Sequence, residues 1–261
     1  MHSASPRISP SRLALWLGGP VAIALGCWIY LAMMIGDMSN IPGMSSMMMK
    51  PHAFNPIQFF GQFFGLFLMW TIMMAAMMLP TAVPMIMAYA RMRAGERRRS
   101  APWLSVLMFS GGYLAAWSAF SLGATLLQTG LTDLALLSPM MMQLPPGPLA
   151  GGVLIAAGVY QLMPLKQACL SQCRTPIAFL MTQWREGNWG GFVMGWRHGL
   201  FCVGCCWALM GILFVTGIMN SAWIIAITLY VLIEKVVPHS QTVSTVAGIS
   251  MIGMGIWTVL A

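Results

Sequence analysis

Residues 197–210, "RHGLFCVGCCWALM", pass from a charged segment directly into an apolar one. Residues four positions apart lie above one another on the same face of an α-helix. A helix here would carry four potential metal ligands on one ridge, with Cys205 beside them: His198, Cys202, Cys206 and Met210. Nitrogen, thiol and thioether donors on one stripe form a ligand set suited to a soft metal ion.

A second cysteine pair has the same spacing. Residues 166–174, "KQACLSQCR", contain Cys169 and Cys173, and the two stretches together hold five of the six cysteines in the chain. We predict that the protein folds to bring these cysteines together.

Composition assigns the chain to a membrane class. It has 261 residues, of which 59% are hydrophobic and only 7% are charged, whereas soluble domains carry about 25% charged residues. A helix crosses a bilayer with roughly 20 apolar residues, so there is room for about seven spans. Nothing in the pattern alternates as strands do. We therefore expect an all-α, polytopic transmembrane helix bundle, with a single domain over residues 13–261 and a disordered N-terminus over residues 1–12.

The expected spans follow from the apolar runs. They cover residues 13–35, 57–90, 103–127, 147–165, 191–218, 222–237 and 243–261. The apolar piece 176–184 is too short to cross and is expected to lie at the interface. Pro80 and Pro84 are expected to break or kink the second span, which is tolerated where the helix is buried in protein or lines a cavity.

The basic residues predict the orientation. If these spans alternate in direction, 12 of the 13 Lys and Arg residues fall on the side of the N-terminus, and Lys50 alone falls on the other side. Because cytoplasmic loops carry the excess of Lys and Arg, we expect a cytoplasmic N-terminus. The Met-containing loops 38–52 and 140–142 then face outward, and both cysteine clusters lie near the cytoplasmic side.

Methionine is the second source of soft donors, with 27 residues. Met69, Met73 and Met77 share one helical ridge, with Met74 and Met78 alongside. Thioethers do not form disulfides and suit an oxidising exterior, whereas thiols persist in the reducing cytoplasm. The hypothesis is a Cu(I) relay from the outer Met loop along this ridge to the cysteines. The alternative is that the ridge consists of ordinary lipid-facing or packing methionines.

Glu234 and Lys235 are adjacent charges in an apolar segment. Charged residues inside a membrane are costly and usually functional, so they could gate a path or pair with Arg197. The alternative is that they lie at the cytoplasmic boundary, with their charged ends in the interface.

Four motifs resemble one known family: "MMAAMMLP" (73–80), "KQACLSQCR" (166–174), "GLFCVGCCWALM" (199–210) and "EKVVP" (234–238). The chain resembles a bacterial family of predicted metal-binding integral membrane proteins linked to copper delivery to copper oxidases. The resemblance implies a protein of the bacterial inner (plasma) membrane that handles a metal, most simply copper as Cu+. Matched by motif, the residues implied are Lys166, Cys169, Cys173, Cys202, Cys205, Cys206, Glu234 and Lys235. The Met47–Met49 and Met140–Met142 clusters are not part of the family pattern.

Three functions remain open. The first is a Cu(I) carrier or chaperone that supplies a cuproenzyme, with membrane lipid and a cuproenzyme or another copper chaperone as partners. The second is a thiol-disulfide oxidoreductase, because Cys202-Val-Gly-Cys205 is a C-x-x-C motif that could pass electrons to quinone. Such chemistry normally serves the oxidising side of a membrane, whereas the cysteines of this chain are expected near the cytoplasmic side. The third is an assembly subunit that binds no metal.

The sequence gives no support for other functional classes. The sequence contains no nucleotide-binding or hydrolase motif. The basic residues lie between apolar spans and form no aromatic and basic face for nucleic acid. The oligomeric state is left open.

Overall fold

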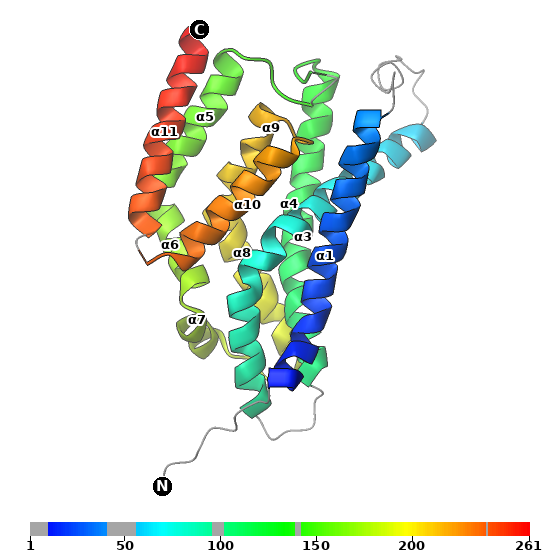
Figure 1. Cartoon of the computed structure of the whole chain (residues 1–261), viewed down its shortest axis with the longest axis vertical. Helices are drawn as coiled ribbons and strands as arrows, with labels where there is room; N and C mark the ends of the chain where they lie inside the picture. Colours follow the sequence, from blue (N-terminus) through cyan, green and yellow to red (C-terminus); the bar gives the residue numbers. More distant parts are fainter. Residues whose placement is uncertain (1–9, 41–55, 96–101, 139–141, 239) are drawn as a thin grey trace.

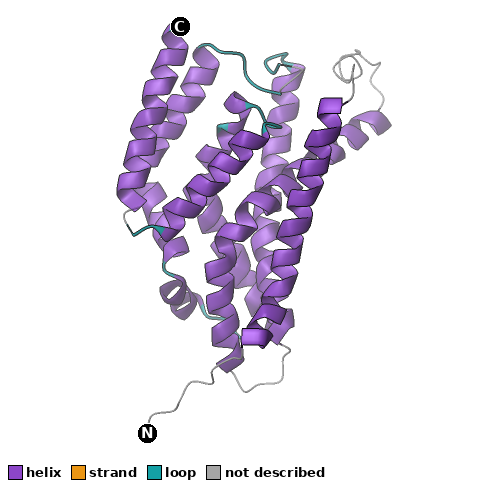
Figure 2. Cartoon of the chain, viewed as in Figure 1, coloured by secondary structure: helices purple, strands orange, loops and turns teal. Residues whose placement is uncertain are grey.

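The computed structural model describes residues 10–40, 56–95, 102–138, 142–238 and 240–261 (Figure 1). Within these ranges all regular structure is helical, and no strand occurs (Figure 2). The helices are α1 (Pro10–Asn40), α3 (Pro56–Gly95), α4 (Pro102–Asp133), α5 (Pro148–Leu162), α6 (Pro164–Arg174), α7 (Pro176–Gln183), α8 (Gly187–Gly211), α9 (Leu213–Thr216), α10 (Ser221–Val236) and α11 (Ser240–Leu260). The predicted all-α class is confirmed.

Four stretches of described helix are long and apolar enough to cross a membrane: Phe59–Arg93, Trp103–Asp133, Gly187–Thr216 and Ser240–Leu260. The bent pair α5–α6 makes a fifth if it is counted as one span. The described apolar part of α1, Gly18–Met34, is shorter, and α10 has 16 residues. The structure thus supports four or five of the seven expected spans by length and composition.

The helices form two groups joined by α10. Helix α3 packs against α1 and α4, α4 packs against α8, and α5 packs against α11. In Figure 1 the helices α1, α3, α4, α5, α8, α10 and α11 run alternately up and down, and the start of α1 and the end of α11 lie at opposite ends of the molecule. Helix α10 contacts both α3 and α11, so it links the two groups.

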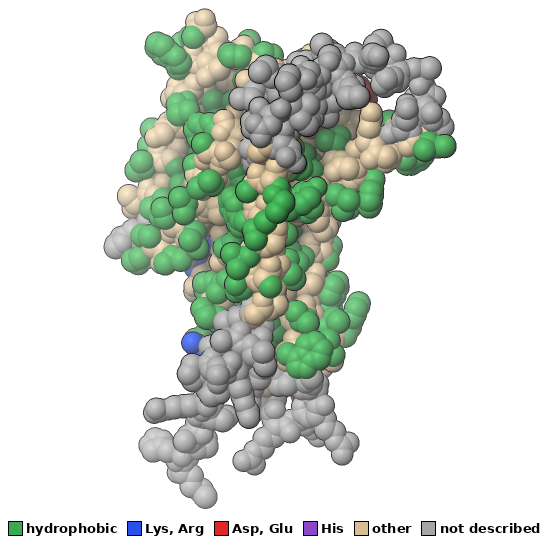
Figure 3. Space-filling model, turned by 45° about the vertical axis from the view of Figure 1, so that its right-hand side comes forward, with side chains coloured by type: hydrophobic (Ala, Val, Ile, Leu, Met, Phe, Trp, Pro, Cys, Tyr) green, Lys and Arg blue, Asp and Glu red, His purple; other side chains and the backbone are tan. Residues whose placement is uncertain are grey.

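The outer surface is largely apolar. Hydrophobic side chains cover much of the face seen in Figure 3. On α11 the exposed residues include Val246, Ile249 and Trp257, and on α1 they include Leu25 and Met33. Exposed apolar side chains on long apolar helices are typical of a protein that faces lipid.

Glycines allow the helices to approach closely. A Cβ added at Gly195 of α8 would lie 1.9 Å from the Phe109 carbonyl oxygen of α4, and one at Gly158 of α5 would lie 2.6 Å from the Gly248 carbonyl oxygen of α11. Small residues at such contacts drive helix association in membranes through close backbone packing.

Helix α3 is one helix through both of its prolines, so of the two expected outcomes, a break or a kink, the break is not found. Pro80 has no N–H and therefore leaves the carbonyl of Ala76, four residues earlier, without its helical donor. Trp28 of α1 supplies a donor, because its Nε1 lies 2.9 Å from the Ala76 oxygen. A neighbouring helix thus satisfies the carbonyl that the proline leaves free.

The chain breaks between two helices at Pro164. Met163 has extended dihedrals, φ −71° and ψ 141°, as the residue before a proline favours. Helix α5 therefore ends at Leu162, and α6 leaves it at an angle of 63°. The fourth expected span, 147–165, is shorter than predicted for this reason. The bend directs α6, with its two cysteines, against α8.

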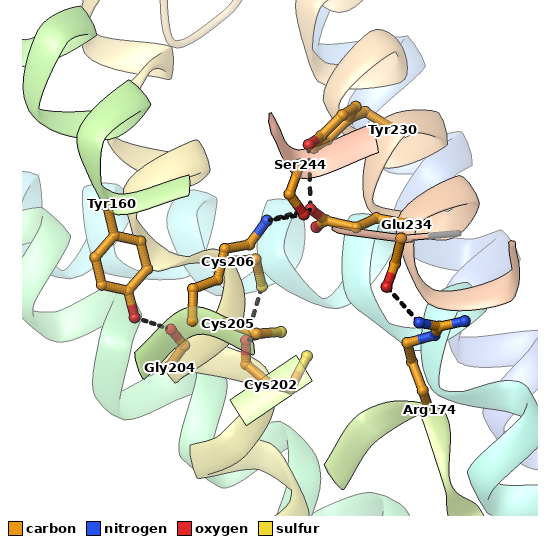
Figure 4. Close-up of polar contacts among 11 residues, drawn as sticks. Tyr160, Arg174, Cys202, Gly204, Cys205, Cys206, Tyr230, Glu234 and Ser244 are labelled. Carbon is orange, nitrogen blue, oxygen red and sulfur yellow. Dashed lines mark hydrogen bonds and ion pairs between the residues drawn. The ribbon is translucent and has the colours of Figure 1, made fainter. Parts of the chain in front are cut away.

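Polar contacts hold α6 at both ends. Near its start, Lys166 forms a fully buried ion pair with Glu234 of α10. Glu234 also accepts hydrogen bonds from Ser244, at 2.5 Å, and from the Tyr230 hydroxyl, at 3.1 Å (Figure 4). At the last residue of α6, Arg174 donates to the Val237 carbonyl and to Ser240. These contacts hold α6 against α10, against Val237 just after α10, and against α11.

Two expectations about charged residues are wrong. Arg197 does not pair with Glu234, because its guanidinium donates to Gln183 while Glu234 pairs with Lys166. Glu234 and Lys235 are both buried, so they do not extend into an aqueous boundary. Both side chains point into the protein because α10 turns this face toward α6 and α3.

Lys166→Met is expected to lower the free energy of unfolding by about 3–5 kcal/mol, because it leaves the Glu234 carboxylate buried without a cation. Glu234→Gln is expected to be destabilising for the converse reason. The double variant should be clearly more stable than the sum of the two losses, since it leaves no buried charge unpaired. Thermal unfolding in detergent micelles measures the stability of the two single variants and of the double variant.

Arg197→Gln serves as the control, because it removes a cation that does not contact Glu234. It should not rescue Glu234→Gln. Strictly additive losses in the Lys166 and Glu234 pair, or rescue by Arg197→Gln, would contradict the observed pairing.

Candidate metal centre

Three thiols from two helices meet inside the bundle. The Sγ atoms of Cys173 on α6 and of Cys202 and Cys205 on α8 all lie within 4.8 Å of one another, and all three residues are buried. With metal–sulfur bonds of about 2.3 Å, trigonal ligands lie about 4.0 Å apart and opposed ligands about 4.6 Å apart. The three sulfurs, which we call the thiol trio, are therefore spaced to bind one ion.

The local sequence explains how α6 comes so close to α8. Cys202 and Cys205 are three residues apart and share one helical face. Gly204 lies between them, and a Cβ at this position would be 2.9 Å from the Cys169 Sγ. The Gly204 carbonyl accepts a hydrogen bond from the Tyr160 hydroxyl of α5 (Figure 4). Cys169 thus packs against this turn, beside the thiol trio rather than within it.

A buried cation faces the thiol trio. The Lys235 ammonium lies 3.1 Å from the Cys202 Sγ and 2.8 Å from the Thr81 hydroxyl, and the residue is only 9% exposed. Among the described residues, no carboxylate forms an ion pair with Lys235, since the Glu234 carboxylate is bound to Lys166. A buried charge requires an opposite charge nearby. Of the two side chains that the ammonium contacts, Cys202 and Thr81, only Cys202 can ionise at ordinary pH.

A tyrosine also contacts this sulfur. The Tyr113 hydroxyl of α4 lies 3.1 Å from the Cys202 Sγ and donates to the Met78 carbonyl at 3.1 Å. Tyr113 and Thr81 were not among the residues expected from the sequence, because each stands alone in an apolar stretch without a motif. The only signal for Tyr113 was general, namely that a buried tyrosine hydroxyl needs a partner.

Cys206 lies apart from the thiol trio. Its Sγ is 2.8 Å from the Cys202 carbonyl oxygen and 4.0 Å from the Met78 Sδ of α3, and both side chains are fully buried. The adjacent cysteines Cys205 and Cys206 therefore face different neighbours, one toward α6 and the other toward α3.

The other two residues of the expected ridge on α8 are buried but are not part of the trio. The His198 ring stacks on Tyr113 at 5.6 Å and meets Phe179 edge-on at 5.5 Å, and its Nδ1 has no hydrogen-bond partner among the residues that the structure describes. Met210 is fully buried one turn beyond Cys206. Of the four residues predicted to share this ridge, the structure places only Cys202 in the trio.

The methionine ridge on α3 faces the protein interior. Met73, Met74, Met77 and Met78 have no exposed surface, and Met69 is buried as well. The interpretation of these residues as lipid-facing is therefore wrong. Their interior position is compatible both with packing and with ligation.

One residue of the second Met-containing loop lies near the far end of this ridge. The Trp70 indole donates to Gln128 at 2.6 Å, and the Gln128 amide nitrogen lies 3.4 Å from the Met142 Sδ. Trp70 directly follows Met69, so two successive contacts lead from the Met142 thioether to the residue next to the start of the ridge. The other loop methionines, at 44, 47–49, 140 and 141, and the side chain of Met38 lie outside the described residues.

Comparison with known protein families matches most of the chain to a family model. The model of the PpoB2 family, described as a copper chaperone, matches residues 67–258. This range contains the thiol trio, Lys235 and the whole methionine ridge. No curated protein and no solved structure matches the chain. Because the matched range is well over half of the sequence, the chain belongs to the PpoB2 copper chaperone family.

Proposed function

We propose that this protein is a multi-pass membrane copper carrier that holds Cu(I) at Cys173, Cys202 and Cys205 and supplies it to a cuproenzyme. The observation that supports this most strongly is the meeting of the three sulfurs within 4.8 Å in a buried site. Cys202 and Cys205 come from α8, and Cys173 comes from the separate helix α6. Copper is the cargo of this site.

The donor set favours Cu(I) over a divalent ion. Thiolates are soft ligands and select Cu(I), whereas zinc in structural sites takes four tetrahedral ligands. Only three Cys sulfurs lie within this spacing among the described residues. The Lys235 ammonium beside Cys202 would balance one negative charge of the copper–thiolate group in apolar surroundings.

The methionine ridge is the proposed route between the thiol trio and the opposite face. From Met69 to Met78 the ridge extends about 14 Å along α3 at 1.5 Å per residue. That is roughly half of a hydrocarbon core of about 30 Å. The interior position of the ridge supports the route, as do the two contacts that Gln128 makes, one with Met142 and one with Trp70. Neutral thioethers bind Cu(I) without adding charge.

The proposed topology is seven spans with the N-terminus in the cytoplasm, in a bacterial inner membrane. The alternating helix directions in Figure 1 support it, as does the position of 12 of the 13 basic residues on one side of the expected spans. With this topology the thiol trio belongs to the cytoplasmic half, where thiols stay reduced. All six cysteines are free in the structure.

The purified protein is expected to bind Cu(I), and alanine at Cys173, Cys202 or Cys205 should each lower the affinity at least about tenfold, a loss of about 1.4 kcal/mol. The affinity should fall because each substitution removes one of the three sulfur ligands of the copper ion. Competition with a chromogenic Cu(I) chelator under anaerobic conditions measures the affinity.

Cys27→Ala is the matched control, because Cys27 is a free cysteine on α1 outside the thiol trio. It should leave the affinity unchanged. Transfer of copper from the loaded protein to a copper-free cuproenzyme should fail in the Cys202 and Cys205 double variant. Unchanged copper binding in that double variant would contradict the proposed site.

Lys235→Met is expected to weaken Cu(I) binding at least about tenfold, because the Cys202 thiolate would then be buried without its cation. The same chelator competition measures the effect, and thermal unfolding shows that the variant is folded. Thr81→Val, which removes the other hydrogen-bond partner of the ammonium, should have a smaller effect. Equal affinities for Lys235→Met and the unaltered protein would show that the cation does not support the site.

A further inference from the structure

We infer that Cys206 and Met78 form a second Cu(I) site, distinct from the thiol trio, which accepts copper from the trio and passes it to the methionine ridge. This inference rests on the proposed function. Its chemical class is a mixed thiolate and thioether site for a soft monovalent ion.

The geometry of the pair suits metal binding. The Cys206 Sγ and the Met78 Sδ are 4.0 Å apart, which equals the separation of about 4.0 Å expected for two trigonal ligands with bonds of about 2.3 Å. The two residues come from different helices, α8 and α3, so helical periodicity does not impose this distance. Both side chains are fully buried, so the site excludes water.

The surroundings leave the two sulfurs facing each other. The Cys206 thiol can donate its single hydrogen to the Cys202 carbonyl at 2.8 Å. The Met78 Sδ is the second acceptor within reach, at 4.0 Å, and the carbonyl oxygen, at the shorter distance, is the better acceptor for the hydrogen. The two soft donors then face each other directly. The backbone of Met78 is fixed, because its carbonyl accepts from the Tyr113 hydroxyl at 3.1 Å and from the Thr81 hydroxyl at 2.9 Å.

The pair lies between the two parts of the proposed route. Cys206 directly follows Cys205 of the thiol trio, and Met78 is the last methionine of the ridge that begins at Met69. In the transfer step, a bond from copper to Cys206 forms as the bond to Cys205 breaks, and the Cys206 proton moves to the Cys205 thiolate that is released.

A bond from copper to the Met78 thioether then forms as the bonds to Cys173 and Cys202 break. Cys202 stays a thiolate beside the Lys235 ammonium, and Cys173 takes up from water the proton that it lost when copper bound. Copper remains Cu(I), so no electron donor or acceptor is needed.

The structure also identifies which methionine makes the contact. The sequence placed Met77 on the main ridge and Met78 alongside it, but Met78 is the residue opposite Cys206. Met77 is equally buried and directly adjacent, which makes it the matched control. Replacement of either residue by Leu conserves volume and is expected to cost less than about 1.5 kcal/mol in stability.

The test uses the full chain, labelled with selenomethionine and loaded anaerobically with Cu(I) in lipid nanodiscs. Copper-edge X-ray absorption then reports whether selenium lies in the first coordination shell. With one equivalent of Cu(I), the shell should contain sulfur only. With two equivalents, a selenium neighbour should appear. It should be lost in Met78→Leu, retained in Met77→Leu, and lost together with the second equivalent in Cys206→Ala.

The outcomes separate this inference from the proposed function. If the unaltered protein binds one equivalent only, or if selenium scattering persists in Met78→Leu, the second site is refuted while the thiol trio stands. If the unaltered protein binds no Cu(I), the proposed function itself fails. Loss of selenium scattering in both Met78→Leu and Met77→Leu would show that the ridge acts without the specific pair, and it would also overturn the inference.

Discussion

The contact between the Lys235 ammonium and the Cys202 sulfur is the interaction on which the proposed metal centre depends. It places a cation inside an apolar bundle, 3.1 Å from a thiol and away from any carboxylate partner among the described residues. Such a cation is stable only with an anionic neighbour. Under the proposed function, this contact prepares one thiol for a soft ion. It also places a positive charge where a copper–thiolate group would otherwise carry excess negative charge.

The rest of the fold brings a third sulfur to this pair. Pro164 interrupts the chain after α5 and turns α6 by 63° toward α8. The buried ion pair of Lys166 with Glu234 then fixes α6, and Gly204 leaves room for its close approach. Each of these features is weak evidence for a metal site on its own. Together they explain why a short, bent helix carries a cysteine into the interior.

Much of this arrangement could be predicted from the sequence. Apolar runs of sufficient length predicted the helices, and the spacing of the cysteines predicted two clusters that meet. The spacing could not show which cysteines meet, because that depends on the bend at Pro164 and on the rotation of α6. Cys173 joins the trio, whereas Cys169, on the same helix, packs against Gly204.

The partners of the charged residues were also beyond prediction. Glu234 and Lys235 are adjacent in sequence, but α10 directs them to different helices, one to Lys166 and the other to Cys202. Arg197 was a plausible partner by position only. Tyr113 gave no pattern to recognise, since its role arises from the packing of α4 against α8.

The most direct test is copper-edge X-ray absorption of the protein with natural methionine, loaded with one equivalent of Cu(I). The thiol trio should give a first shell of sulfur at about 2.3 Å with a coordination number near three. Cys173→Ser should reduce this number by one, and Cys169→Ser should leave it unchanged. A shell of nitrogen and oxygen, or a sulfur shell that is insensitive to Cys173→Ser, would contradict a site shared between α6 and α8.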